Sequence, residues 1–193
     1  DFYVELEEPG ISINSELPSS LVEDKLRAQQ SFRKEKQILF GDTHVHTTYS
    51  TDAFLWSLPI LNGEGPHPIS DACDFARFCA NLDFWVSTDH AEALTPRKWK
   101  SIKEAVRNCN NPTDSSEPDL VTFLGYEWTQ VGDTAQNHYG HKNVMFRDIE
   151  VNKVPKRPIG AGGIATNGMR DSLPGQSKQL RPAALLDFNN RHR

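Results

Sequence analysis

The sequence lacks the features that mark membrane proteins and disulfide-stapled scaffolds. No apolar run approaches the ~20 residues that a membrane-spanning helix needs, so we expect no membrane span. Only three cysteines occur among 193 residues, Cys73, Cys79 and Cys109, and their spacing matches no metal-binding pattern. We interpret them as reduced, small residues of the core.

Several functional classes also lack their signatures. The chain has no Gly-x-Ser-x-Gly motif, and the glycines at 160–163 have neither the lysine nor the preceding strand of a phosphate-binding loop. A net charge of −5 argues against a nucleic-acid-binding surface. The first residues are acidic and lack methionine, so no signal peptide is visible and we expect a processed protein or a fragment. Compartment and oligomeric state are left open.

Composition divides the chain into three parts. Residues 1–37 read as an N-terminal arm and a polar helix, which Ser20 and Glu23 open as a capping box. Residues 38–150 alternate strand and helix patterns and form the core. Residues 151–193 are rich in Gly and Pro, and we expect there a long loop and the start of a truncated remainder.

Short apolar runs within the core predict four strands, at residues 38–40, 84–87, 120–124 and 143–146. The Gly- and Pro-containing stretch from 47 to 69 is expected to be a loop. Helical patterns occur between the expected loop and the second strand, and between the second and third strands. This alternation predicts an α/β fold with a parallel sheet or barrel, whose functional residues gather at the carboxyl ends of the strands.

Two helices are expected between these strands. Ser70 caps the first, and its apolar positions recur at helical spacing in Ala72, Phe75, Ala76 and Cys79. Thr95 caps the second, with Pro96 at the first helical position. The predicted buried face of this second helix comprises Trp99, Ile102, Val106 and Cys109.

Ligand-type residues appear where the first strand ends. His44 and His46 are two apart, so on a strand both imidazoles project from one face and can reach one metal ion. Asp52 follows in the polar stretch after them, and a loop can fold it back to a neighbouring metal. The alternative for Asp52 is a turn or helix-capping residue. His44, His46 and Asp52 are our first candidate metal ligands.

The second and third strands end in the same way. His90 follows the second strand as a candidate metal ligand, and Asp89 beside it can bind directly or orient a ligand. The alternative is a capping Asp with an exposed His. Glu127 follows the third strand, and a carboxylate there can bridge two metal ions, as two-metal hydrolases require. We expect Glu127 and Asp89 to take part in catalysis.

Two later histidines are alternatives for one further ligand. His141 precedes the fourth strand, whereas His138 lies in the loop before it. We favour His141 as the metal ligand and keep His138 as the alternative. Mixed imidazole and carboxylate ligands suit zinc, manganese or iron.

These residues occur in four ordered segments, "FGDTHVHTTYSTDAF", "WVSTDHAE", "FLGYEWTQ" and "GHKNVMFRD". Over residues 38–148 they resemble the first three motifs of the PHP (polymerase and histidinol phosphatase) superfamily. The residues of these four segments look closest to those of the PHP-like domain-of-unknown-function family 3604. The resemblance implies a distorted seven-stranded β/α barrel, of which the N-terminal part with about four strands is present.

The resemblance also implies two or three divalent metal ions, zinc, manganese or iron. His44 and His46 would hold the first ion, and Glu127 would bridge it to a second ion bound by His141. Asp52 and His90 would hold the third. The superfamily completes its site with a further histidine and a late Asp-x-His motif, and nothing after His141 supplies them here.

These observations predict a metal-dependent hydrolase that uses metal-activated water. Its substrate is expected to be a small anionic ester, and a phosphoester is the first choice among such esters. The alternatives are a catalytically incomplete PHP-like structural or binding module, and a metal-dependent hydrolase of another ester or of a C–N bond. No substrate-binding residue is assigned.

Overall fold

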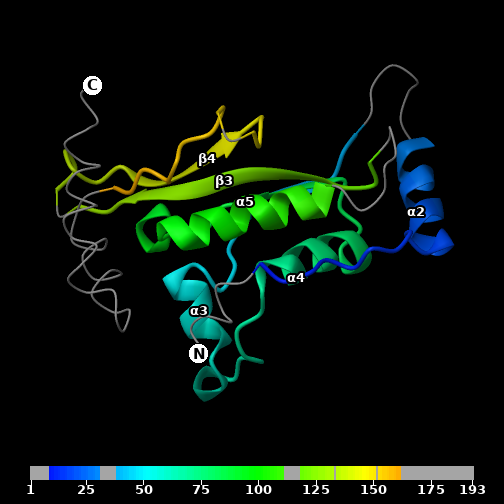
Figure 1. Ribbon diagram of the computed structural model, residues 1–193, viewed down its shortest axis with the longest axis horizontal. Helices are drawn as coiled ribbons and strands as arrows, with labels where there is room; N and C mark the ends of the chain where they lie inside the picture. The colour runs from blue at the N-terminus through cyan, green and yellow to red at the C-terminus, as the bar shows by residue number, and fades with distance from the viewer. Residues whose placement is uncertain (1–8, 31–37, 111–117, 133, 151, 162–193) are drawn as a thin grey trace.

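The computed structural model describes residues 9–30, 38–110, 118–132, 134–150 and 152–161, which form a mixed α/β fold (Figure 1). Its four-stranded sheet has the order β1-β2-β3-β4. The strands are β1 (Gly41–Val45), β2 (Phe84–Ser87), β3 (Val121–Gln130) and β4 (Gly140–Phe146). The predicted α/β class with four strands is confirmed, and the described part of the sheet corresponds to half of a barrel.

The expected all-parallel sheet is wrong at its last strand. β1, β2 and β3 are parallel, but β4 pairs antiparallel with β3. A parallel return needs a crossover of about a dozen residues or more, and residues 131–139 are too few to form one. β3 and β4 therefore form a hairpin, which changes the direction from which His141 reaches the sheet.

Two strand boundaries also differ from the prediction. β1 begins after the apolar run 38–40, whose side chains are 38–52% exposed at the edge of the sheet. β3 continues past Leu124 to Gln130, because pairing with β4 extends the ladder from Leu124 to Gln130 after β2 has ended at Ser87. Glu127 therefore lies inside β3 and does not follow it.

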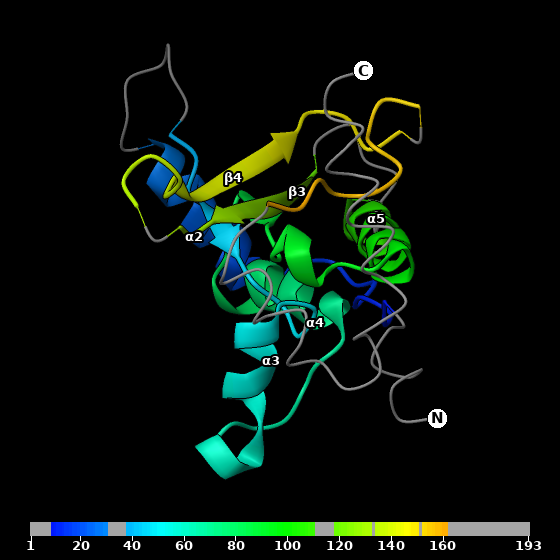
Figure 2. The ribbon, with the colours of Figure 1, turned by 90° about the vertical axis from the view of Figure 1, so that its left-hand side faces the viewer.

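The helices and helical turns are α2 (Ser19–Gln30), α3 (Thr51–Ser57), η1 (Pro59–Leu61), α4 (Ile69–Asp74), η2 (Phe75–Cys79), η3 (Ala91–Ala93) and α5 (Pro96–Asn110). α3 occupies part of the expected loop at 47–69, and it projects away from the sheet (Figures 1 and 2). Ser20 and Ser70 lie inside their helices, so the two predicted serine caps are wrong. Among the described residues, no helix is long and apolar enough to span a membrane.

The second predicted helix is confirmed in α5. Thr95 Oγ1 accepts a hydrogen bond from the Lys98 backbone N–H at 3.1 Å, as an N-cap does. Trp99 and the other three residues of the predicted face are at most 1% exposed. α5 packs this face against β3, where Trp99 contacts Tyr126 edge to face.

The first predicted helix has a different buried face. Phe75 is 64% exposed and Cys79 is also exposed, whereas Cys73, Ala76 and Arg77 are buried. The helix changes from α to π at Phe75, whose carbonyl accepts the N–H of Ala80 five residues on. This wider turn rotates the later side chains out of the simple helical phase, which the apolar spacing alone does not show.

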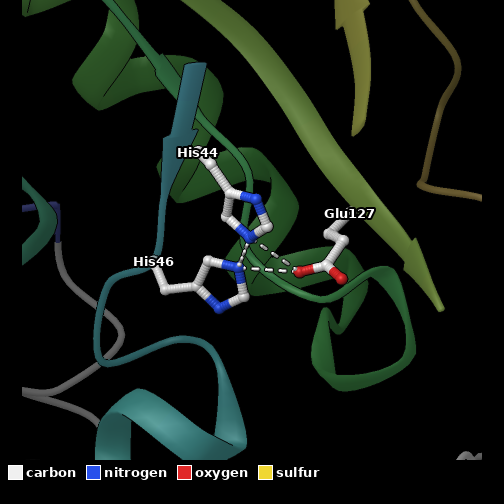
Figure 3. Close-up of side chains that lie close together, drawn as sticks. All are labelled: His44, His46 and Glu127. Atoms are coloured by element: carbon white, nitrogen blue, oxygen red, sulfur yellow. Dashed lines mark hydrogen bonds and ion pairs between the residues drawn. The ribbon is translucent and has the colours of Figure 1, made fainter. Parts of the chain in front are cut away.

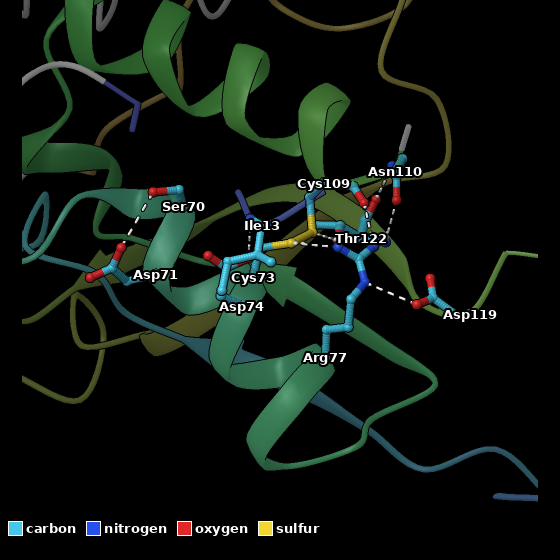
Figure 4. Close-up of a disulfide and its surroundings, with 10 residues drawn as sticks. All are labelled: Ile13, Ser70, Asp71, Cys73, Asp74, Arg77, Cys109, Asn110, Asp119 and Thr122. Atoms are coloured by element: carbon cyan, nitrogen blue, oxygen red, sulfur yellow. Dashed lines mark hydrogen bonds and ion pairs between the residues drawn. A yellow bond between two sulfur atoms is a disulfide. The ribbon is translucent and has the colours of Figure 1, made fainter. Parts of the chain in front are cut away.

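A disulfide joins Cys73 of α4 to Cys109 of α5, with the Cα atoms 6.0 Å apart (Figure 4). The reduced-cysteine interpretation is therefore wrong for this pair, and Cys79 is the free thiol. Beside the disulfide, buried Arg77 donates to the Cys109 carbonyl at 2.8 Å and pairs with Asp119 at 3.1 Å. The packing of α4 against α5 brings the two cysteines together, and their sequence spacing gives no sign of it.

Candidate metal centre

The end of β1 presents His44 and His46 on one face. Their rings stack with centroids 4.8 Å apart and an interplanar angle of 19°. An irregularity in the β1–β2 register precedes Val45, where Thr88 Oγ1 accepts from the Val45 N–H at 2.9 Å. This side-chain bond closes the gap in the ladder and fixes the backbone between the two histidines.

Asp89 anchors the turn that follows His46. Its Oδ1 accepts the Thr47 backbone N–H at 2.7 Å and the Ser50 hydroxyl at 3.0 Å. Ser50 Oγ in turn accepts the His90 N–H at 2.9 Å. Burial raises the pKa of Asp89, and the bonds from Thr47 and Ser50 oppose that rise. The buried carboxylate thus faces the turn and not the imidazoles.

His90 lies between two candidate partners. Its backbone forms an isolated parallel β-bridge with Glu127 of β3, and its side chain is 6% exposed. Nδ1 is 2.8 Å from Thr129 Oγ1, while Nε2 is 3.3 Å from Asp52 Oδ2. Asp52 occupies the first turn of α3, and its Oδ1 is 3.5 Å from His46 Nδ1. α3 therefore carries this carboxylate back to the strand ends.

Glu127 lies at the buried centre of the cluster, with a side chain that is 1% exposed. Its Oε2 is 2.8 Å from His46 Nε2 and 3.2 Å from His44 Nε2 (Figure 3). Burial alone would raise the pKa of Glu127, but the neighbouring imidazoles, His46 first, lower it to about 2. The carboxylate is ionised, as a cation ligand must be.

His46 shows the reciprocal effect. Burial alone would lower its pKa, but hydrogen bonds to Asp52 and Glu127 raise it to about 10. The same contacts hold the pKa of Asp52 well below its usual range. The two carboxylates thus favour positive charge at His46.

The fourth strand contributes His141 and not His138. The register places His141 opposite Thr129, and its Nδ1 contacts Glu127 Oε1. His138 is exposed in the hairpin loop, where its Nδ1 contacts the Gly132 carbonyl at 3.3 Å. The antiparallel direction of β4 brings its first residues beside the second half of β3, which explains why His141 reaches Glu127.

Three overlapping sets of side chains in the described residues could each hold a cation: His44–His46–Glu127, His46–Asp52–His90 and His90–Glu127–His141. Within each set the ligand atoms lie within 4.8 Å of one another. All six predicted metal ligands belong to these sets, whereas Asp89 and His138 belong to none. Imidazole nitrogen with carboxylate oxygen is a donor set that fits zinc, manganese or iron. We call these six side chains the candidate metal centre.

Sequence reasoning missed two polar residues behind this centre. Thr129 is 2% exposed and touches three of the six side chains. Glu92 is 8% exposed, and its Oε1 accepts the N–H of Ala161 at 2.6 Å and of Thr129 at 3.4 Å. Burial raises the pKa of Glu92. The two-residue strand period could have identified Thr129, since it shares a face of β3 with Glu127.

A family model described as Protein of unknown function (DUF3604) matches residues 33–97 and 80–169. The chain belongs to this family. This match confirms the predicted DUF3604 resemblance. The matched residues include all six side chains of the candidate metal centre. Comparisons with curated proteins and with solved structures gave no match.

Proposed function

We propose that this DUF3604 protein is a metal-dependent hydrolase of the PHP type, and that its first substrate class is small phosphoesters. The convergence of six imidazole and carboxylate side chains from β1, α3, the end of β2, β3 and β4 carries this proposal. Their order along the chain follows the PHP motifs that the sequence resembles. A distorted β/α barrel, of which this sheet is one part, belongs to the same proposal.

The proposed cation positions follow from the contacts. His44 and His46 share one position with Glu127, whose second oxygen faces His141. Asp52 and His90 define a further position. Two oxygens on one carboxylate allow Glu127 to bridge, whereas a neutral imidazole nitrogen offers one lone pair.

Exposure within the centre indicates how substrate would enter. The side chains of Glu127 and His90 are 1% and 6% exposed and form the buried floor of the centre. Those of His44, Asp52 and His141 are 52%, 49% and 55% exposed and form an open rim. An anionic ester can therefore reach the cations from the rim, while the buried Glu127 keeps them in place.

A bound divalent cation supplies a Lewis acid and lowers the pKa of a coordinated water towards neutrality. The chain's own part is to hold the ligands in place and to balance charge. Glu127 and Asp52 contribute negative charge on opposite sides of His46. The three half-exposed ligands leave room for substrate beside them, which fits a catalytic centre better than a closed structural one.

The test is hydrolysis of 4-nitrophenyl phosphate by the protein supplied with Mn²⁺ or Zn²⁺, beside the matching sulfate and acetate esters. We expect phosphate release that falls at least about 100-fold in Glu127→Gln, because the bridging charge is lost. Glu104→Gln on the exposed side of α5 is the matched control and should keep full activity. Preference for the sulfate or acetate ester would reassign the substrate class.

Metal binding without hydrolysis of any of the three esters would contradict the hydrolase proposal and favour the incomplete binding module. Equal activity of Glu127→Gln and the unchanged protein would contradict the assignment of the centre.

A further inference from the structure

The buried hydroxyl of Thr129 meets three side chains of the candidate metal centre. Its Oγ1 is 2.8 Å from His90 Nδ1, 3.1 Å from Glu127 Oε1 and 3.3 Å from His141 Nδ1. A threonine hydroxyl has one proton to donate and two lone pairs that accept. His90 and Glu127 are the two nearest of these neighbours, and the direction of the hydrogen bond to each can be worked out.

An ionised carboxylate only accepts hydrogen bonds, so the Thr129 proton points to Glu127 Oε1. The hydroxyl oxygen then accepts from His90, its nearest neighbour, which requires a proton on Nδ1 of His90. Nδ1 of His141 also contacts Glu127 Oε1, so its contact with Thr129 assigns no proton to it. A neutral imidazole with a proton on Nδ1 has its lone pair on Nε2. The ligand nitrogen of His90 is therefore Nε2.

Nε2 of His90 faces Asp52 and not Glu127. It lies 3.3 Å from Asp52 Oδ2, whereas the nitrogen nearer to Glu127 Oε2, at 3.6 Å, is Nδ1. A lone pair and a carboxylate oxygen face each other across this gap, and a cation between them satisfies both. His90 belongs to two of the overlapping sets, but one lone pair can serve only one cation.

We propose that Thr129 is a positioning residue that assigns His90 to the cation shared with Asp52, by keeping a proton on His90 Nδ1. The proposal rests on the metal centre of the proposed function. The place of Thr129 is itself fixed, because its backbone N–H donates to Glu92 Oε1 at 3.4 Å and β4 pairs beside it at His141. Thr129 thereby separates the Asp52–His90 position from the Glu127–His141 pair.

The test is nuclear magnetic resonance of the full chain with ¹⁵N-labelled histidine and ¹¹³Cd²⁺ alone as the probe. We expect cadmium coupling on Nε2 of His90 and a protonated Nδ1. In Thr129→Val, which removes the hydroxyl at nearly constant volume, the preference for Nε2 should be lost. Zinc should bind one position about 10- to 100-fold more weakly there, the usual cost of removing an outer partner of a ligand.

Two variants control for structural damage. Thr129→Ser keeps the hydroxyl and should restore the Nε2 coupling, with zinc affinity within about threefold of the unchanged protein. Thr122→Val makes the same change at another buried threonine of β3, whose hydroxyl donates to Cys109 Sγ, and should alter neither readout. If Thr129→Val does not fold, the coupling pattern of Thr129→Ser and of the unchanged protein still decides.

Coupling through His90 Nδ1 in the unchanged protein would overturn the role of Thr129 while leaving the metal centre in place. Retention of Nε2 coupling and full zinc affinity in Thr129→Val would do the same. If cadmium binds none of the six side chains, the metal centre of the proposed function fails, and the assignment of His90 fails with it.

Discussion

His46 and Glu127 are joined through Nε2 and Oε2 at 2.8 Å, although His46 directly follows the first strand and Glu127 lies in the third. Asp52 and this contact with Glu127 together raise the pKa of His46 to about 10 against the effect of burial, and the contact contributes to lowering that of Glu127 to about 2. It pairs a cationic imidazole with a buried carboxylate where we propose that a metal ion binds. Proton and metal ion therefore compete for the same nitrogen.

The first prediction concerns stability against pH in protein stripped of metal with EDTA. The His46 contribution is complete below its unfolded pKa of 6.5 and is lost as the pH rises through about 10. The Glu127 contribution is complete above 4.5 and is lost as the pH falls through about 2. The advantage of the unchanged protein over Glu127→Gln in urea unfolding should therefore peak between those unfolded values. A constant difference across pH would contradict this pairing.

The second prediction concerns proton release. At neutral pH the raised pKa keeps His46 protonated, so zinc binding should displace about one proton from it. The apparent zinc affinity should rise by up to about tenfold for each pH unit between 6 and 8. Titration calorimetry in two buffers of different ionisation enthalpy measures the proton count. His46→Gln should release fewer protons, and an unchanged count in that variant would be inconsistent with displacement from His46.

The third prediction concerns Asp89. In Asp89→Asn one of the two acceptor oxygens becomes an NH₂ group, so the side chain can no longer accept all the hydrogen bonds that Thr47 and Ser50 donate to it. We expect a loss of about 1–3 kcal/mol in the free energy of unfolding, measured with urea, and weaker zinc binding because the turn after His46 shifts. Asp71→Asn, at a half-exposed carboxylate of α4, is the control and should change little. Loss of hydrolysis with unchanged stability would instead favour direct catalysis by Asp89.

The fourth prediction concerns the disulfide between α4 and α5. Cys73 and Cys109 are 36 residues apart, so their bond shortens a long loop of the unfolded chain. Replacing Cys73 with Ala should lower the free energy of unfolding by about 2–4 kcal/mol. Cys79→Ala should have a small effect, because that thiol is exposed and unpaired with another cysteine. If a reducing agent leaves the unfolding curve of the unchanged protein in place, the disulfide does not stabilise the fold.

Much of the candidate centre could be predicted because strand periodicity and residue chemistry act locally. His44 and His46 share a face by the two-residue period, and His90 follows a clear apolar run. Choosing His141 over His138 required only the position of the fourth strand. These residues therefore come together as the alternation of strands and helices predicts.

The differences come from contacts that local patterns do not contain. β4 reverses direction because too few residues separate it from β3, and its pairing lengthens β3 past Glu127. The π turn at Phe75 changes which residues of that helix are buried. Asp89 is predicted to take part in catalysis, and the sequence gives no sign of its hydrogen-bond partners Thr47 and Ser50, which only the folded turn brings to it.

The most direct test of the central claim is metal content after incubation with Zn²⁺ or Mn²⁺ and desalting, measured by plasma mass spectrometry, with X-ray absorption for the ligands. We predict more than one cation for each chain, imidazole and carboxylate ligation, and a loss of metal in Glu127→Gln but not in Glu104→Gln. Protein that retains no metal under these conditions, or retains the same amount after Glu127→Gln, would contradict convergence of these side chains on shared cations.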